Sequence, residues 1–415
     1  MSPAAIGRRT FAALANPNYR RWYAGQGISL IGTWMQTIAQ GWLVYTLSGS
    51  GTALGLVVAL QMVPVLFLAP YAGVIADRVD KRRLIIAVQA VMGVLALALG
   101  LLTVTGVVQL WEVFVLAALL GVATAFDNPT RQAFVMELVG PDHVRNAVTL
   151  NSVLVNAARA VGPAMAGILI ATVGVSICFL VNAGSYLAVI ASLLLLDRSA
   201  LRPSLPAPRA RGQLREGLRY VASTPALAVP LAMMAVIGAL AYEFQVVLPI
   251  IARETFGGGA EDYGFMTAAM GIGAVVGGLV VAGSGRTGTR AVILAGYGFG
   301  IAILLAAAAP SLPLELAALT VVGAASVTFL AVGNSTLQLA ARPDMRGRVM
   351  SLWAVAFLGT TPLGGPIAGY VSETAGGRAG LLMGGVACIL AAAAGSAILS
   401  PRGRSALGRV RVRQA

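Results

Sequence analysis

The sequence contains very few charged residues for its length. Only 11% of its 415 residues are Asp, Glu, Lys or Arg, against 58% that are hydrophobic. A soluble globular domain carries about 25% charged residues, so this composition excludes that class. There is one histidine, and the two cysteines, Cys178 and Cys388, each lie in an apolar run. Such positions favour neither a disulfide framework nor a metal site.

Groupings of residues that carry enzymatic chemistry are missing as well. The sequence has no Ser/His/Asp set, no cluster with metal-ligand spacing and no phosphate-binding loop. We therefore expect a protein that is not an enzyme and that uses no cofactor and no metal.

The chain has long apolar runs instead. Residues 53–75 and 84–104 are two of these runs, and residues 73–83 (GVIADRVDKRR) form a charged turn where they meet. Each run has about the 20 residues that a helix needs to cross a hydrocarbon core. The four cations of the turn place it on the cytoplasmic side of a membrane. Taken singly, these cations are expected to be solvated.

The remaining runs predict an all-α polytopic membrane protein with twelve transmembrane helices in two pseudo-symmetric six-helix bundles. Both termini are expected in the cytoplasm. The predicted parts are a cytoplasmic tail (1–21), an N-terminal bundle (22–196), a cytoplasmic linker (197–224), a C-terminal bundle (225–399) and a second cytoplasmic tail (400–415).

The formal net charge of +14 follows the same topology. Of the 29 Lys and Arg residues, all but Arg159, Arg253 and Arg378 fall on the predicted cytoplasmic side. This asymmetry is typical of membrane insertion, so no nucleic-acid partner is expected. The chain is rich in Ala, Gly and Arg but has a single Lys, which indicates a bacterial source and hence the cell (inner) membrane.

Two short motifs recur at an offset close to half the chain. Pro141-Asp142 recurs as Pro343-Asp344, and Gly162-Pro163 recurs as Gly365-Pro366. In both copies an Asp precedes a long helix, so Asp142 and Asp344 are predicted N-caps. A duplication of six-helix halves is typical of transporters that bind substrate near the midplane of the membrane.

The turn at residues 73–83 resembles the signature loop between helices 2 and 3 of major facilitator superfamily transporters. The matching residues are Gly73, Asp77, Arg78, Lys81 and Arg82, with Asp80 where that family usually has Gly. The resemblance implies a cytoplasmic gate. A carboxylate at a helix C-terminus is disfavoured by the macrodipole, so Asp77 should face the N-terminus of another helix, which we expect to begin near Arg346.

A second element resembles the Gly-Pro-x-x-Gly-Gly motif of major facilitator antiporters. It consists of Gly162, Pro163 and Gly167, with Ala166 replacing one Gly. Small residues allow tight helix packing, and Pro163 can bend the helix. Ordinary packing with a kink explains the same residues equally well.

Residues 127–131 (DNPTR) resemble a motif of the branch that contains macrolide exporters, enterobactin exporters and transmembrane secretion effectors. The position of Arg159, just ahead of Gly162, resembles the same branch. This resemblance implies proton-driven export of small hydrophobic or amphipathic compounds. Asp127 and Arg131 are four residues apart, so they can pair on one helix face if the helix continues past Pro129. The alternative is a capped helix end.

Two ionisable residues, Arg159 and Glu243, are predicted deep in the membrane, where charge is costly unless it is paired or functional. We expect a carboxylate near Arg159, from Asp127, Glu243 or the substrate. Burial away from water favours the neutral form of Glu243, so we expect it to carry the coupling proton, with Asp127 as the next candidate. The alternatives are a neutral Glu243 bonded to a helix carbonyl, or a permanent pair with Arg159.

The predicted protein is a secondary active transporter that exports drug-like or siderophore-like compounds by alternating access. Its partners are a small-molecule substrate, protons and the lipid bilayer, and it is expected to be a monomer. An importer or facilitator of a small metabolite, and a non-transporting receptor or assembly protein, are the alternatives. The residues expected to line the substrate cavity are Gln36, Gln40, Tyr242, Gln245 and Asn334.

Overall fold

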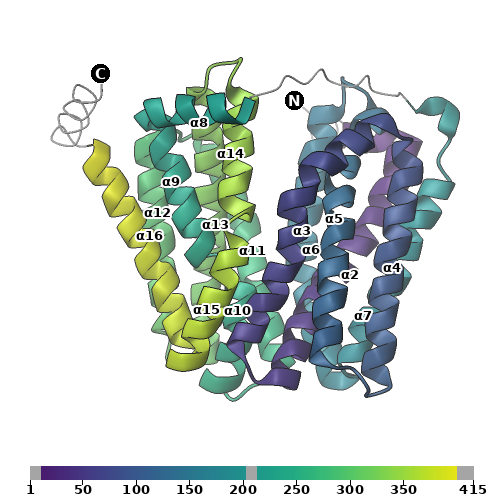
Figure 1. The fold of residues 1–415 in the computed structure, drawn as a ribbon, viewed down its shortest axis with the longest axis horizontal. Coiled ribbons are helices and arrows are strands. Elements are labelled where there is room, and N and C mark those ends of the chain that lie inside the picture. The colour runs from purple at the N-terminus through teal and green to yellow at the C-terminus, as the bar shows by residue number, and fades with distance from the viewer. Residues whose placement is uncertain (1–10, 202–212, 400–415) are drawn as a thin grey trace, which may run out of the picture. The chain divides into compact units, whose positions relative to one another are not determined.

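The computed structural model describes residues 11–201 and 213–399, and every regular element in these ranges is helical (Figure 1). The first ten residues of the predicted N-terminal tail, residues 202–212 of the predicted linker and the tail 400–415 lie outside the described residues. The all-α fold class predicted from the sequence is confirmed for the described part of the chain.

Six long helices come first along the chain. They are α2 (Pro17–Ser48), α3 (Gly51–Arg78), α4 (Lys81–Val104), α5 (Leu110–Val139), α6 (Val144–Thr172) and α7 (Val175–Leu194). A short 3-10 turn, η1 (Ala12–Ala15), precedes α2, and another, η2 (Arg198–Ala200), follows α7. Helix α7 packs against α2 and α4, and α2 also packs against α6.

The second part of the chain begins with a surface helix and continues through shorter segments. The elements are α8 (Gln213–Ser223), α9 (Pro225–Leu240), α10 (Phe244–Ile250), the π turn η3 (Ile251–Thr255), α11 (Ala260–Ser284), α12 (Thr289–Ala307), α13 (Leu312–Ala340), α14 (Arg346–Leu358), α15 (Thr361–Ala375) and α16 (Gly377–Leu399). Helix α12 packs against α13 and α16, and α9 packs against α14 and α16.

Ten helical segments within the described residues are long and apolar enough to cross a membrane. Helix α2 is long enough, but its glutamine and threonine residues make it too polar to be counted. Helices α14 and α15 have 13 and 15 residues, so each is shorter than the roughly 20 residues that a span requires. Large apolar side chains such as Phe67, Leu279 and Leu294 are exposed along the counted segments, as lipid contact requires.

The chain divides into two compact units. Among the described residues, unit 1 comprises 11–49, 56–201 and 258–271, and unit 2 comprises 50–55, 213–257 and 272–399. Two helices therefore contribute to both units, since the first turn of α3 belongs to unit 2 and the first half of α11 to unit 1.

Glycines permit the packing of these two helix ends. In unit 2, Gly55 on α3 lies against the Gly365 backbone of α15, and a Cβ added to Gly55 would collide with the Gly365 carbonyl. In unit 1, a Cβ added to Gly264 on α11 would lie 2.6 Å from the Pro163 oxygen and 2.9 Å from the Gly167 Cα of α6. Helices can approach this closely only where side chains are absent.

The charged turn after α3 is more deeply buried than expected. The Lys81 ammonium lies 2.7 Å from Glu137 Oε1, with side-chain exposures of 6% and 10%. Arg82 Nε donates to the Leu193 carbonyl at 2.7 Å, so it satisfies an acceptor in the last turn of α7. The expectation that these cations are solvated is therefore wrong for Lys81 and Arg82, because α4 begins against the ends of α5 and α7.

The predicted N-caps are also wrong. Helix α6 begins after His143 and α14 begins after Met345, so the capping position lies one residue beyond each Asp. Asp344 instead forms an ion pair with Arg342 at 2.9 Å. The Pro-Asp step therefore lies in the turn before each helix, and its Asp does not occupy the N-cap position.

The buried Lys81–Glu137 pair gives a test of this packing. Removing one partner of a buried ion pair costs about 3–5 kcal/mol, because the other charge stays buried. We expect Lys81→Met to lower the Tm of the purified protein, measured with a thiol-reactive dye that reports exposure of the buried Cys178 and Cys388.

The matched control is Arg83→Met. Arg83 is 77% exposed and pairs loosely with Asp80 at 3.7 Å, so its loss should change the Tm little. The double variant Lys81→Met, Glu137→Gln should recover much of the lost stability. Equal Tm values for Lys81→Met and Arg83→Met would contradict a stabilising role for the buried pair.

Candidate functional site

The site begins with the polar residues of α2. Asn16 caps this helix by accepting from the Asn18 and Tyr19 amides, and Pro17 occupies its first position. Farther along, polar side chains recur at three- or four-residue intervals and so share one face of the helix. On that face, the Thr33 and Thr37 hydroxyls donate to carbonyls one turn earlier, at 2.9 and 3.0 Å. This arrangement places polar groups inside a bundle of otherwise apolar helices.

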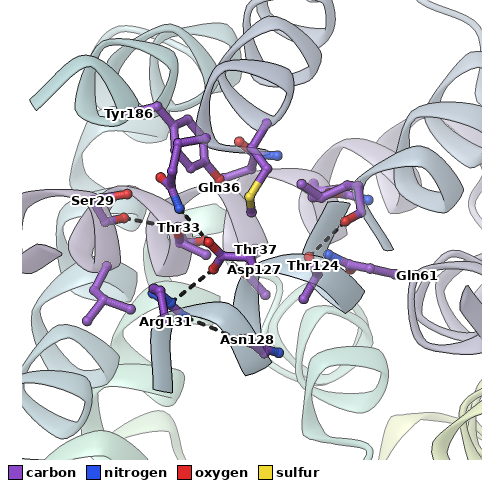
Figure 2. A pocket seen from close by; sticks show the side chains of 15 residues that line it. Ser29, Thr33, Gln36, Thr37, Gln61, Thr124, Asp127, Asn128, Arg131 and Tyr186 are labelled. Atoms are coloured by element: carbon purple, nitrogen blue, oxygen red, sulfur yellow. Dashed lines mark hydrogen bonds and ion pairs between the residues drawn. The ribbon is translucent and has the colours of Figure 1, made fainter. Parts of the chain in front are cut away.

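These side chains line a cavity of about 150 Å³ in unit 1 (Figure 2). Residues from α2, α3, α4, α5 and α7 form its wall, and most of them are polar but uncharged. The wall consists of Ser29, Leu30, Thr33, Gln36, Thr37, Gln40, Gln61, Gln89, Met92, Leu120, Thr124, Asp127, Asn128, Arg131 and Tyr186.

The charged residues of the cavity wall form one connected network. Helix α5 continues past Pro129, so Asp127 and Arg131 share a face and pair, with 3.0 Å between Arg131 Nε and Asp127 Oδ2. Gln89 Nε2 donates to Asp127 Oδ1 at 2.8 Å. The two remaining Arg131 nitrogens donate to Gln26 Oε1 at 2.8 Å and to Asn128 Oδ1 at 3.2 Å. The positive charge of Arg131 and the negative charge of Asp127 balance each other, and Figure 2 shows the contacts of Arg131 with Asp127 and Asn128.

Of the predicted cavity residues, Gln36 and Gln40 lie in this wall. Gln36 Oε1 accepts from Asn182 Nδ2 at 2.6 Å, which orients its amide. Gln61 and Gln89 were not predicted as site residues. Each is nonetheless one of the few polar side chains in a long apolar run, and that signal could have identified both.

Arg159 lies elsewhere in unit 1, on α6. Its guanidinium carbon is 5.0 Å from the centre of the Trp34 ring, which is a cation–π geometry. Asp127, one of the carboxylates expected beside Arg159, is ion-paired with Arg131. Gly162 packs beside Trp34, since a Cβ added to Gly162 would lie 2.6 Å from the Trp34 Cβ. Gly167 packs in the same way against the Glu261 backbone of α11.

Glu243 lies in unit 2 at the break between α9 and α10. It is 5% exposed, and its Oε1 has no hydrogen-bond partner among the described residues. Its carboxyl lies close to Gly364 and Gly365 of α15, where an added Cβ would stand 2.8 Å from Oε1 and 3.5 Å from Oε2 respectively. A carboxyl group in such surroundings is costly to ionise.

The other predicted cavity residues also belong to unit 2. Tyr242 donates its hydroxyl to the Ser326 carbonyl at 2.9 Å, and its ring packs against Phe299 and Phe357 at 5.1 and 5.2 Å. Gln245 is half-buried on α10. Asn334 accepts a hydrogen bond from Gln338 within α13. Tyr242 is thus part of an aromatic cluster.

The predicted gate residues lie at the junction of α3 and α4. Gly73 and Asp77 are in the last two turns of α3, and Asp77 is half-buried. Arg78 is exposed. Asp80, which departs from the family pattern, is the N-cap of α4 and accepts from the Arg83 amide at 3.0 Å.

Relatives of known name are transporters. The chain is 27% identical to the multidrug efflux pump Tap of Mycolicibacterium fortuitum, over 85% of this chain and 87% of that protein. It is 25% identical to the enterobactin exporter EntS of Escherichia coli, over 90% and 92%. A match to the staphyloferrin A transporter of Staphylococcus aureus, 27% identical, spans 62% of this chain and 65% of that transporter.

Solved structures share the fold at much lower identity. A bacterial homologue of the lysosomal transporter Spinster, facing inward, has a TM-score of 0.73 and 14% identity over 91% of this chain and 95% of its own. The nucleoside transporter NupG also has a TM-score of 0.73, with 15% identity over 92% and 99%. The sequence model for transmembrane secretion effectors matches residues 8–408. The chain therefore belongs to the transmembrane secretion effector family of the major facilitator superfamily.

Proposed function

We propose that the protein is a secondary active exporter of small hydrophobic or amphipathic compounds, driven by protons through alternating access. The observation that carries the proposal is the polar cavity of unit 1, which lies among helices that are otherwise apolar. Polar side chains inside membrane-spanning helices cost free energy when they face lipid, and they commonly mark substrate or ion pathways. Family membership and the names of the relatives, which include a drug efflux pump and a siderophore exporter, support export over uptake.

We further propose twelve spans with both termini in the cytoplasm. Helix α2 supplies one span beyond the ten counted, because its polar residues face the cavity and not lipid. Helices α14 and α15 together supply the other, joined at Gly359 and Thr360. We also propose that the protein is a multi-pass monomer of a bacterial inner membrane.

An accumulation assay tests export. Efflux-deficient bacteria expressing the chain would be loaded with a panel of drugs and metal-free siderophores. Export predicts lower accumulation of at least one compound, reversed by a protonophore. Raised accumulation of a panel member would instead favour an importer, and no change for any compound would favour a protein that does not transport.

Within this mechanism, Glu243 carries the coupling proton. Its carboxyl is buried in an apolar setting where the neutral form is favoured, and it lies at a helix break that can rearrange as the site opens. Deprotonation would place a charge there that the surroundings do not balance. Proton binding and release at Glu243 would thereby bias the two conformations of the transporter.

We expect Glu243→Gln to abolish efflux driven by a proton gradient while leaving downhill substrate exchange intact. Glutamine is nearly isosteric and cannot release a proton. The measurement compares both fluxes in proteoliposomes, with Asp344→Asn as a control for removing an exposed carboxylate from the same unit, since its surface pair with Arg342 contributes little. Gradient-driven efflux equal to that of the wild type in the Glu243 variant would move the proton to another group, with Asp127 the next candidate.

Asp127 and Arg131 should act together as an ion pair in the cavity. Asp127→Asn leaves the half-buried Arg131 guanidinium without its carboxylate, and because the Arg131 side chain is 25% exposed the cost should fall below the roughly 3–5 kcal/mol of a fully buried pair. We expect this variant to lose stability and transport together, measured by Tm and by flux in proteoliposomes. Adding Arg131→Gln should restore the Tm but not the flux. An Asp127→Asn variant with the Tm of the wild type would show that the pair does not stabilise the site.

The gate is the remaining part of the proposal. Gly73, Asp77 and Arg78 form the cytoplasmic gate, with Arg131 at the cytoplasmic side of the cavity. Lys81 and Arg82 contribute by fixing the start of α4 against α5 and α7.

A further inference from the structure

Two apolar helices of unit 1, α4 and α5, form an open groove of about 300 Å³ along their seam. Its rim is exposed at Val91, Leu119 and Val122, whereas Val88 and Ala123 are buried beneath it. The lining side chains are all hydrocarbon, and they belong to Ala87, Val88, Val91, Leu95, Leu119, Val122, Ala123 and Phe126. An exposed apolar groove on two membrane-spanning helices is a surface for the hydrocarbon of the bilayer.

The groove has the depth of a lipid chain. At 1.5 Å per residue it begins about 9 Å and ends about 21 Å from Lys81, the first residue of α4. The hydrocarbon core of a bilayer is about 30 Å thick, so each leaflet supplies about half of this depth. In the proposed topology α4 begins on the cytoplasmic side. A lipid of the cytoplasmic leaflet therefore reaches the groove with its acyl chain.

An exposed cation stands where the groove begins. Arg83 is one helical turn before Ala87, so the two residues lie on one face of α4. The Arg83 side chain is 77% exposed, and its Nε is 3.7 Å from Oδ2 of the exposed Asp80. A loose pair on an exposed surface contributes little, so this guanidinium can bind a second anion.

The charge around Arg83 favours such an anion. Residues 77–83 contain four cations and two acids, and Glu137 neutralises Lys81, which leaves a net charge of +1. Arg82 is buried and donates to the Leu193 carbonyl, whereas Arg78 and Arg83 are exposed. A guanidinium matches the geometry of phosphate oxygens and can bind two of them at once. A hydrocarbon groove with this cation at its entrance matches the two parts of a phospholipid.

We propose that the groove binds an acyl chain of an anionic phospholipid and that Arg83 binds the phosphate of its headgroup. A zwitterionic lipid carries its own cation beside the phosphate, so it gains less from the net positive charge. Basic residues at the cytoplasmic surface attract anionic lipids in the same way. The site uses only the membrane-facing surface of unit 1, so it does not depend on the direction of transport.

The bound lipid lies behind the polar cavity. On α4, Val88 of the groove directly precedes Gln89 of the cavity wall. On α5, Ala123 precedes Thr124 in the same way. The hydrogen bond from Gln89 to Asp127, at 2.8 Å, joins these two helices. An acyl chain in the groove therefore contacts both helices that hold this bond, which links the lipid to the cavity.

Photocrosslinking tests the site with a phosphatidylglycerol probe that carries a diazirine on one acyl chain. The purified protein is irradiated with the probe in detergent micelles, and mass spectrometry measures labelling of residues 87–95 and 119–126. Unlabelled phosphatidylglycerol or phosphatidylcholine is titrated as the competitor. We expect phosphatidylglycerol to compete at about fivefold lower concentration, the effect of one arginine near an anionic lipid.

Variants separate the headgroup contact from the groove. Arg83→Met should make the two competitors equal, whereas Arg145→Met, which removes an exposed cation at the start of α6, should keep the difference. Ala87→Phe fills the groove and should abolish most of the labelling. Ala90→Phe, at an exposed position of the same helix outside the groove, should leave the labelling unchanged.

Equal competition by the two lipids in the wild type would overturn the proposal, because the groove would then be a general lipid contact. A preference that survives Arg83→Met, or labelling that Ala87→Phe does not reduce, would overturn it as well. Export is tested separately by the accumulation assay, so failure of the lipid site leaves the proposed function standing.

Discussion

The structure depends on how charge is accommodated inside an apolar bundle. In unit 1, Asp127 and Arg131 neutralise each other, and Gln89, Gln26 and Asn128 make further hydrogen bonds to them. In unit 2, Glu243 is buried with no such partner for Oε1. A balanced pair can stay charged in a low dielectric, whereas a lone carboxyl is favoured only when it is neutral. The first arrangement suits a fixed binding wall and the second suits a group that gains and loses a proton.

Much of this arrangement could be predicted from residue spacing alone. Apolar runs of about 20 residues identify the long helices, and the four-residue interval between Asp127 and Arg131 predicts their ion pair once the helix passes Pro129. The polar residues of α2 predict its cavity-facing side, and Gln36 and Gln40 lie there. These features are local or follow a helical period, so they need no knowledge of which helices are neighbours.

Features that depend on neighbours could not be predicted in this way. Lys81 and Arg82 are buried because of Glu137 and the end of α7, which are distant in sequence. The Trp34 ring beside Arg159 and the donor from Gln89 to Asp127 each join two different helices. The break at residues 241–243 divides a continuous apolar run that periodicity alone reads as one helix. Tertiary contacts decide each of these, and a hydropathy pattern does not contain them.

The central claim is that the buried Glu243 carboxyl is neutral, whereas the Asp127 carboxyl is held in its ion pair with Arg131. Infrared spectroscopy of the purified protein in lipid measures this directly, because a protonated carboxyl and a carboxylate absorb at different frequencies. We predict a protonated carboxyl band near neutral pH that loses a component in Glu243→Gln, and Glu315→Gln, which changes another deeply buried acid among the described residues of unit 2, identifies any component that belongs to Glu315. A band that is the same in the wild type and in Glu243→Gln would contradict the account.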